Sequence, residues 1–203
     1  MIRNIVFDMG NVVLRFSADL FLDREGVTDP EDRKTILNEL FRSVEWSMMD
    51  LGLLTEEEVE PRVLARVPEH LKAHVSHLLY SWAEPRAMVE GMEDLVRRLK
   101  TAGYGIYLLS NASVSQPKYW SPLPISRVFD GTLISAEVRL VKPMPEIYRL
   151  FTETFSLKPE ECVFIDDFPL NVAAAIAEGW EGIVFHGDAA ELEAKLREKG
   201  IAF

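Results

Sequence analysis

Short apolar runs alternate with amphipathic stretches along most of the chain. Five runs are typical of strands, the last of them the weakest: residues 2–8, 104–110, 162–166, 182–186 and 131–135. Because the runs at 104–110, 162–166 and 182–186 are short and apolar, we expect them to be buried on both faces of a sheet. Between the runs, residue spacing predicts helices at about 90–102, 145–155, 169–178 and 188–199. The alternation predicts an α/β fold with a mainly parallel sheet and helices on both of its faces.

Residues 16–87 interrupt this alternation. Segments 28–31 and 55–58 both have the spacing of a helix capping box. Apolar residues then recur at helical intervals, at Ile36, Leu37, Leu40, Phe41 and Val44. A connection this long is not an ordinary loop, so we expect several helices inserted over the strand ends. The expected organisation is an α/β core domain of residues 1–15 and 88–203, and a helical cap domain of residues 16–87.

Side chains capable of chemistry follow several of the apolar runs. We expect four groups at strand ends: Asp8; Ser110 with Asn111; Lys142; and Asp166 with Asp167. Ligands of open α/β sheets bind at the carboxyl edge of the strands. A carboxylate, a hydroxyl, a lysine and an acidic pair at that edge are the parts of a metal-assisted phosphoryl-transfer site.

The acidic residues have a chemical and a structural interpretation. Asp8 is either a nucleophile that forms an acyl phosphate or an ordinary turn aspartate. Adjacent carboxylates such as Asp166 and Asp167 are costly at a buried edge unless a cation compensates them, and their oxygens suit Mg²⁺. The alternative for this pair is a solvated acidic turn.

The remaining candidates are also ambiguous when each is taken alone. Ser110 and the backbone N–H groups near Asn111 either hold phosphate oxygens or belong to a simple turn. Pro143 disfavours helix at Lys142, so the lysine either points toward Asp8 and the phosphate or lies on the surface. Asn171 either orients metal-bound water or caps the following helix.

Composition and charge narrow the class of protein. Apolar residues make up 48% and charged residues 27% of the 203 residues, as in globular rather than disordered chains. No apolar run has the length of a bilayer span, and Asp8 interrupts the first run before a signal peptide can form. We therefore expect no membrane partner and a cytoplasmic location. The net charge of −11 argues against broad nucleic-acid binding, which depends on clustered positive charge. Because the overall field repels an anionic substrate, attraction must come locally from a metal ion, Lys142 and helix N-termini.

The cysteine and the clustered histidines indicate no second site. Cys162 is the single cysteine, which excludes an intrachain disulfide, and we expect it to be a buried structural thiol. His70, His74 and His77 have the spacing of one helix face. Zinc normally needs three or four organised ligands, and no suitable cysteine or acidic partner is evident. We therefore expect a solvated or packed helix face there.

In order and spacing, the segments around Asp8, Ser110, Lys142 and the Asp166-Asp167 pair resemble the four motifs of the haloacid dehalogenase superfamily. The resemblance covers essentially the whole chain and is specific to phosphatases with a helical cap after the first strand. It implies a Rossmann-like core and a small phosphorylated metabolite as substrate. By this resemblance Asp8 is the nucleophile, Ser110 the phosphate-binding hydroxyl and Lys142 the charge-balancing lysine.

The same resemblance implies a Mg²⁺ cofactor. It makes Asp167 a direct ligand of the metal, and Asp166 an acidic neighbour that ligates it or orients its water. It makes residues 16–87 the cap that encloses the substrate and helps to select it.

One position departs from the family pattern. Family phosphatases usually carry a second aspartate two residues after the nucleophile, as general acid and base, and here that position is Gly10. The Gly10 carbonyl can still bind Mg²⁺, but it cannot transfer a proton. General acid–base catalysis is commonly worth ~10²–10⁴-fold, or about 3–5 kcal/mol of barrier. The glycine therefore implies an easier leaving group, a substitute acid from the cap or solvent, or slow turnover.

Three functions follow, in decreasing order of support. The first is a Mg²⁺-dependent phosphatase that hydrolyses a small phosphate monoester through an aspartyl-phosphate intermediate. The Asp-Met-Gly-Asn-Val form resembles a bacterial phosphatase subgroup that includes α-D-glucose-1-phosphate phosphatase, and a sugar 1-phosphate has the more acidic leaving group that Gly10 favours. The second function is a metal-independent 2-haloacid dehalogenase, which also lacks the second aspartate, although the Asp166-Asp167 pair counts against it. The third is a catalytically inactive binding module.

Overall fold

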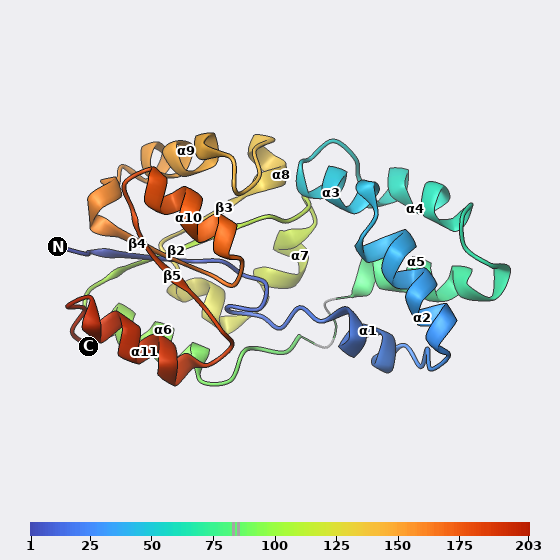
Figure 1. Ribbon diagram of the computed structural model, residues 1–203, viewed down its shortest axis with the longest axis horizontal. Helices are drawn as coiled ribbons and strands as arrows, with labels where there is room; N and C mark the ends of the chain where they lie inside the picture. Colours follow the sequence, from blue (N-terminus) through green and yellow to red (C-terminus); the bar gives the residue numbers. More distant parts are fainter. Residues whose placement is uncertain (83, 85) are drawn as a thin grey trace.

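The structure, a computed structural model, describes residues 1–203 apart from Ala83 and Pro85, which lie near the end of the expected cap and outside the described residues. In this described part, five parallel strands form one sheet in the order β3-β2-β1-β4-β5. The strands are β1 (Asn4–Phe7), β2 (Gly105–Ser110), β3 (Gly131–Ile134), β4 (Cys162–Asp166) and β5 (Glu181–Val184). Each of the five predicted runs overlaps one of these strands, and the expected parallel α/β sheet is confirmed (Figure 1).

Strand β1 occupies the centre of the sheet. Its residues are all buried, and they pair in register with Gly105 to Leu108 of β2 on one side and Cys162 to Ile165 of β4 on the other. The chain order reverses between β1 and β4, because β2 and β3 follow β1 outward in one direction and β4 returns to its other side. Such a reversal leaves a crevice outside the carboxyl ends of the strands. Asp8 directly follows β1 and therefore lies at this crevice.

Helices cover both faces of the sheet, as predicted. Ile5 and Phe7 pack with α6 (Met92–Thr101) and α11 (Ala189–Glu198) in one hydrophobic cluster. Val6 points to the other face and packs with α9 (Pro145–Phe155) and α10 (Pro169–Ala177). Figure 1 shows the two helix layers on opposite sides of the strands. The remaining short elements of this part are α7 (Gln116–Trp120), η3 (Pro124–Val128), α8 (Ser135–Val138) and η4 (Pro159–Glu161).

A separate group of helices lies beyond the carboxyl edge of the sheet (Figure 1). It consists of α1 (Ala18–Arg24), α2 (Pro30–Ile36), η1 (Leu37–Phe41), α3 (Val44–Asp50), α4 (Glu56–Leu64), η2 (Glu69–Leu71) and α5 (Lys72–Ser81). These helices bury their own hydrophobic cluster, distinct from the two clusters of the sheet. We refer to residues 16–87 below as the insert.

The caps and the helical periodicity of the insert differ in part from the prediction. Thr55 and Glu58 form the expected capping box, but Asp29, not Thr28, caps α2, because its carboxylate accepts from the N–H groups of the first turn. The apolar periodicity does not extend to Val44, which is 62% exposed. A π-helical turn ends at Phe41, and a new helix begins at Val44, so the earlier register is lost.

Two further expectations concern Cys162 and membranes. Cys162 is fully buried at the start of β4, as expected for a structural thiol. Among the helices formed by the described residues, none is both long and apolar enough to span a bilayer.

Candidate active site

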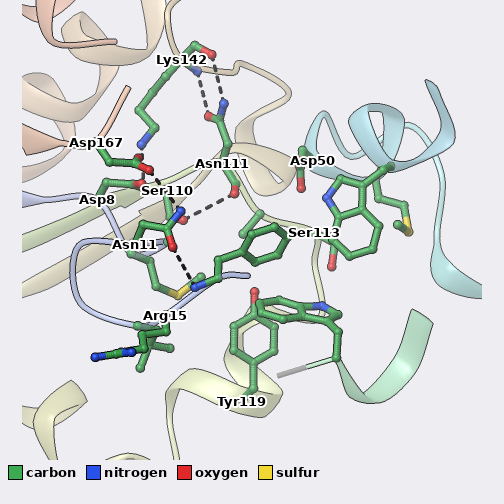
Figure 2. Close-up of a pocket in the computed structure, with 18 of the residues that line it drawn as sticks. Asp8, Asn11, Arg15, Asp50, Ser110, Asn111, Ser113, Tyr119, Lys142 and Asp167 are labelled. Atoms are coloured by element: carbon green, nitrogen blue, oxygen red, sulfur yellow. Dashed lines mark hydrogen bonds and ion pairs between the residues drawn. The ribbon is translucent and has the colours of Figure 1, made fainter. Parts of the chain in front are cut away.

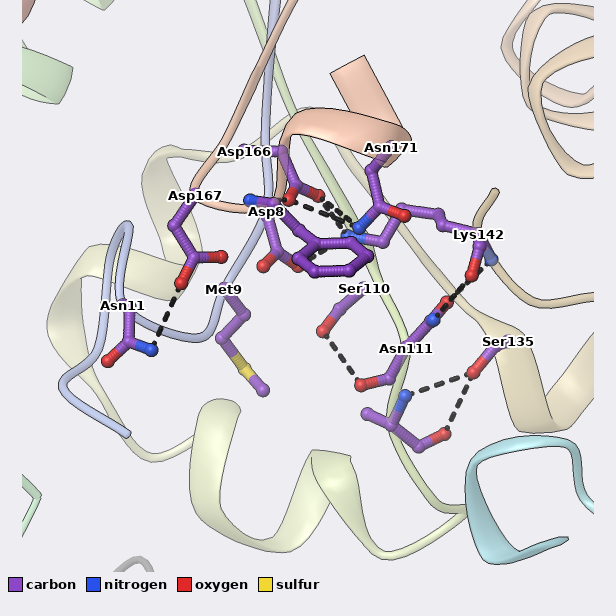
Figure 3. Close-up of polar contacts among 12 residues, drawn as sticks. Asp8, Met9, Asn11, Ser110, Asn111, Ser135, Lys142, Asp166, Asp167 and Asn171 are labelled. Carbon is purple, nitrogen blue, oxygen red and sulfur yellow. Dashed lines mark hydrogen bonds and ion pairs between the residues drawn. The ribbon is translucent and has the colours of Figure 1, made fainter. Parts of the chain in front are cut away.

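A buried lysine bridges two of the predicted aspartates. The Lys142 ammonium donates to Oδ1 of Asp8 and to Oδ2 of Asp166, at 2.7 Å in both cases. The lysine side chain is 2% exposed and that of Asp166 is not exposed at all. Burial alone favours a neutral amine, but the two carboxylates outweigh it and raise the pKa of Lys142. The sheet thus brings the Asp8, Lys142 and Asp166 positions into direct contact (Figure 3).

Lys142 does not follow a strand, contrary to the prediction. It lies in the loop between α8 and α9, and Asn111 at the end of β2 holds that loop in place. The Asn111 amide accepts from the Lys142 backbone N–H at 2.8 Å and donates to its carbonyl at 3.0 Å. The Asn111 side chain is therefore committed to positioning the lysine. This leaves only its backbone for the predicted contact with phosphate.

Asp166 is surrounded by hydrogen-bond donors. Besides Lys142, it accepts from the Phe168 backbone N–H at 2.7 Å and from the Asn171 amide at 3.1 and 3.0 Å. Asn171 lies inside α10 and orients Asp166, whereas the residue at the N-cap of this helix is Phe168. The capping alternative for Asn171 is therefore wrong.

Asp167 completes an acidic cluster at the mouth of the crevice. Asp8, Asp166 and Asp167 each have a carboxylate oxygen within 4.8 Å of the others. Asn11, in the turn after β1, donates to Asp167 at 3.1 Å and accepts from the backbone N–H of Phe16. Burial raises the pKa of Asp167, although the Asn11 bond opposes the shift. The turn after β1 therefore fixes one face of the cluster.

The charges of this cluster do not balance without a further cation. Burial raises the pKa of Asp8 to about 7 even though Lys142 favours its carboxylate form, and Asp166 adds to the shift. Lys142 bonds to Asp8 and Asp166, which are both buried, and Asp167 adds a third carboxylate beside them. Mg²⁺ prefers oxygen ligands of this kind, so the donor set fits that ion.

A cavity of about 240 Å³ opens over the cluster (Figure 2). The sheet side of its wall contains the side chains of Asp8, Ser110, Lys142 and Asp167, whereas Asp166 lies behind it. Gly10 also lines the cavity, and a Cβ there would meet only the Cβ of Phe16, at 3.7 Å. The structure therefore brings every predicted site residue to one place.

The insert forms the opposite wall. It contributes Phe16, Trp46, Met49, Asp50, Glu56, Leu79 and Trp82, and Tyr119 of α7 joins them. Ring centroids of Phe16 and Trp82, and of Trp82 and Tyr119, are 5.0 Å apart. The wall facing the acidic cluster is therefore largely aromatic, with two carboxyl groups among the rings.

Sequence reasoning missed Asn11, Asp50 and most of the aromatic wall; for Trp46 and Met49 it left a core position and the substrate-facing edge of the insert both open. Asp50 had a detectable pattern, since it interrupts an apolar run just before a glycine, as Asp8 does. The aromatic residues had none, because rings at helical spacing are equally typical of a core. Their place on the cavity depends on how the insert meets the sheet.

The histidines of the insert have acidic partners that the sequence did not reveal. His74 and His77 both contact the Glu25 carboxylate, at 3.1 and 2.6 Å, and His70 contacts Asp32 at 3.0 Å. These partners were not evident from the sequence, because Glu25 and Asp32 lie 38 to 52 residues away along the chain. The three aspartates described above remain the only cluster among the described residues with metal-ligand geometry.

Known proteins resemble this chain over different shares of their length. Drimenol cyclase drtB of Aspergillus calidoustus is 27% identical over 192 residues, which are 92% of this chain and 34% of that protein. Mouse bifunctional epoxide hydrolase 2 is 35% identical over 144 residues, which are 68% of this chain and 26% of that protein. The chain thus spans about a third or less of these two relatives. D-ribitol-5-phosphate phosphatase of Bacteroides thetaiotaomicron is 22% identical and matches 89% of this chain and 90% of its own.

Solved structures share the fold. A HAD family enzyme of Bacteroides thetaiotaomicron, crystallised with magnesium and inorganic phosphate, has a TM-score of 0.71 at 21% identity and covers 95% of this chain and 99% of its own. L-2-haloacid dehalogenase of Xanthobacter autotrophicus has a TM-score of 0.66 at 18% identity and covers 100% of this chain and 85% of its own.

A family model supplies the assignment. The model of the haloacid dehalogenase-like hydrolases matches residues 2–179, which include the insert and every predicted site residue. This chain belongs to the haloacid dehalogenase-like hydrolases.

Proposed function

We propose that this hydrolase is a Mg²⁺-dependent phosphatase that cleaves a small phosphate monoester through an aspartyl-phosphate at Asp8. One observation carries the proposal: a buried lysine bridges the candidate nucleophile and Asp166, while a third carboxylate, Asp167, lies beside them on the cavity. A reaction that handles a phosphate needs this combination of positive charge and metal-binding oxygens.

Mg²⁺ would be held by Asp8, Asp167 and the Gly10 carbonyl. Asp8, Gly10 and Asp167 line the cavity, whereas both oxygens of Asp166 already accept hydrogen bonds from other donors. We therefore assign Asp166 to holding Lys142 and orienting the metal's water. When bound, the ion neutralises phosphate charge and keeps the phosphate beside the nucleophile.

The chain's own residues account for the two displacements. Lys142 and the Ser110 hydroxyl hold phosphate oxygens, together with the backbone N–H groups at the end of β2. Asp8 attacks phosphorus in line with the leaving oxygen and becomes an acyl phosphate. Water then attacks the same phosphorus, which releases inorganic phosphate and restores the Asp8 carboxylate.

Residues 16–87 act in this proposal as a cap over the core of residues 1–15 and 88–203. Support comes from the cavity, whose walls are divided between the acidic cluster and the insert. Closing such a cap excludes water from the acyl phosphate, and opening it releases product.

The substrate class is a small phosphorylated metabolite, and a sugar 1-phosphate is the first compound to test. The cavity of about 240 Å³ suits a small leaving group, and Trp46 and Trp82 line it, as aromatic side chains that can pack against a ring. The Ser113 hydroxyl and the Glu56 carboxylate, 2.7 Å apart, can bind hydroxyl groups. An anomeric oxygen also leaves more readily than that of a simple alcohol.

The experiment is an assay of phosphate release from alkyl, aryl and anomeric esters, with Mg²⁺ and with a chelator. We expect release only with Mg²⁺, and none from Asp8→Asn. Near-normal turnover by Asp8→Asn would show that Asp8 is not the nucleophile. Chloride release from a 2-haloacid without Mg²⁺ would instead support the dehalogenase. No reaction with either class of compound would support a binding module.

A further inference from the structure

The leaving oxygen of an alkyl phosphate needs a proton, and Gly10 cannot supply one. An alkoxide is a strong base, so protonating it during bond cleavage commonly accelerates the reaction by ~10²–10⁴-fold. The donor must lie on the cavity and be protonated near neutral pH. It must also be free of the metal and of strong ion pairs.

We propose that Asp50, which the insert carries into the cavity, is the general acid and base of this reaction. Asp50 is the last residue of α3 and lines the same cavity as Asp8. Figure 2 shows its carboxylate among the side chains that surround the cavity. This assignment rests on the proposed phosphatase activity.

The segment that carries Asp50 is anchored to the core at two points. The Asp50 carbonyl accepts a hydrogen bond from the Ser135 hydroxyl, and Ser135 also accepts from the Ala112 backbone N–H at 3.0 Å. Gly52 packs so closely on Ala136 that a Cβ would be 2.1 Å from its carbonyl oxygen. Because Ala112 lies just beyond Ser110 and Asn111, Ser135 ties Asp50 to the segment proposed to bind phosphate. The acid is thus positioned by the core although it belongs to the insert.

The surroundings of Asp50 favour its protonated form. Burial raises the pKa of Asp50 to about 7, the negative charge of Asp8 adds to the shift, and Lys142 opposes it. Tyr119 and Glu56 are the other titratable groups of this part of the wall. A carboxyl group with this pKa can give up a proton and recover it within one turnover.

The other groups on the cavity are less suitable donors. Burial raises the pKa of Tyr119 far above neutrality, so its phenol does not release a proton readily. Glu56 already accepts a hydrogen bond from Ser113. Lys142 is committed to Asp8 and Asp166.

The proton balance closes over one cycle. As Asp8 forms its bond to phosphorus, the bond from phosphorus to the leaving oxygen breaks, and protonated Asp50 gives its proton to that oxygen. The Asp50 carboxylate then takes a proton from water as the water oxygen attacks phosphorus. The Asp8–phosphorus bond breaks, and the products are the alcohol and inorganic phosphate, with Asp50 protonated again.

The test compares an alkyl phosphate with p-nitrophenyl phosphate in wild type and Asp50→Asn, both with Mg²⁺. The p-nitrophenolate leaves without a proton, so only the alkyl ester depends on the acid. We expect kcat/KM for the alkyl ester to fall by ~10²–10⁴-fold. We expect kcat/KM for the aryl ester to fall by less than about tenfold, because this ratio reports the steps up to loss of the leaving group. In Asp50→Asn with the aryl ester, phosphorylated Asp8 should also accumulate, because the water that hydrolyses it no longer has a base.

Two further variants separate catalysis from folding. Asp50→Glu keeps a carboxyl group and should recover part of the alkyl-ester activity. Glu57→Gln removes an exposed acid of the insert that does not line the cavity, and should leave both esters unaffected.

The outcomes distinguish this proposal from the proposed function. Equal losses with the two esters, or no loss with either, would overturn the assignment of Asp50 while wild-type turnover still supports the phosphatase. Absence of Mg²⁺-dependent release by wild type would overturn the phosphatase itself, and the role of Asp50 with it.

Discussion

Replacing Lys142 with methionine tests the charge balance at the centre of the site. The lysine is 2% exposed and lies 2.7 Å from both Asp8 and Asp166. Methionine fills a similar volume without charge, so the variant leaves two buried carboxylates facing each other. Removing one partner of a buried ion pair costs about 3–5 kcal/mol. We therefore expect Lys142→Met to lose about that much unfolding free energy at pH 8.

The unfolding free energy lost by Lys142→Met should increase with pH. Burial raises the pKa of Asp8 to about 7 even with the lysine present, and removing the lysine raises it further. A carboxyl group whose folded pKa exceeds its unfolded pKa destabilises the fold as pH rises through the folded value. The difference between wild type and Lys142→Met should therefore be largest at pH 8 and shrink toward pH 5.

Urea unfolding at pH 5 and pH 8, with a chelator present, measures this difference. Lys72→Met is a matched control, because Lys72 pairs with Glu69 at 2.6 Å on the surface and should contribute less than about 1 kcal/mol. A cost for Lys142→Met as small as that of the control, or one independent of pH, would refute the reasoning.

Three further predictions follow from the same contacts. Asp50→Asn should stabilise the protein by about 2–4 kcal/mol at pH 8 and by nothing below pH 4, because burial raises the pKa of Asp50 to about 7 and the ionised form is therefore costly only at high pH. Urea unfolding that shows no gain in stability at pH 8 would contradict this. Asn111→Ala should lower kcat/KM about tenfold or more by releasing the Lys142 loop, and unchanged kinetics would show that the amide bonds do not position the lysine. Mg²⁺ should raise the Tm of wild type more than that of Asp167→Asn, and equal shifts would remove Asp167 from the metal site.

The fold was predictable because its strands have simple local patterns. Central strands such as β1 and β4 are buried on both faces, so their sequences are short apolar runs with chemistry directly after them. The predicted strand end at Lys142 was wrong because this residue lies in a loop that has no local pattern of its own. Its loop is held by long-range bonds to Asn111, and such bonds leave no periodic pattern in the sequence.

The site was predictable where it follows the sheet and not where the insert meets it. Asp8 and Ser110 lie at strand ends, so parallel pairing alone brings them together. Asp50 reaches the cavity through contacts of the insert with Ser135 and Ala136, whose positions depend on the packing of the whole molecule. The bonds from Asn111 to the Lys142 backbone and the place of Asp50 on the cavity therefore required the structure.

The most direct test of the central claim is the mass of the Asp8 peptide after turnover of p-nitrophenyl phosphate is stopped with acid. The aryl group leaves quickly, so hydrolysis of the phosphoenzyme limits the rate and the intermediate accumulates. With Mg²⁺ we predict one phosphoryl group on Asp8, matched by a burst of p-nitrophenol, and neither with a chelator. Continued phosphate release with an unmodified Asp8 and no burst would contradict the account.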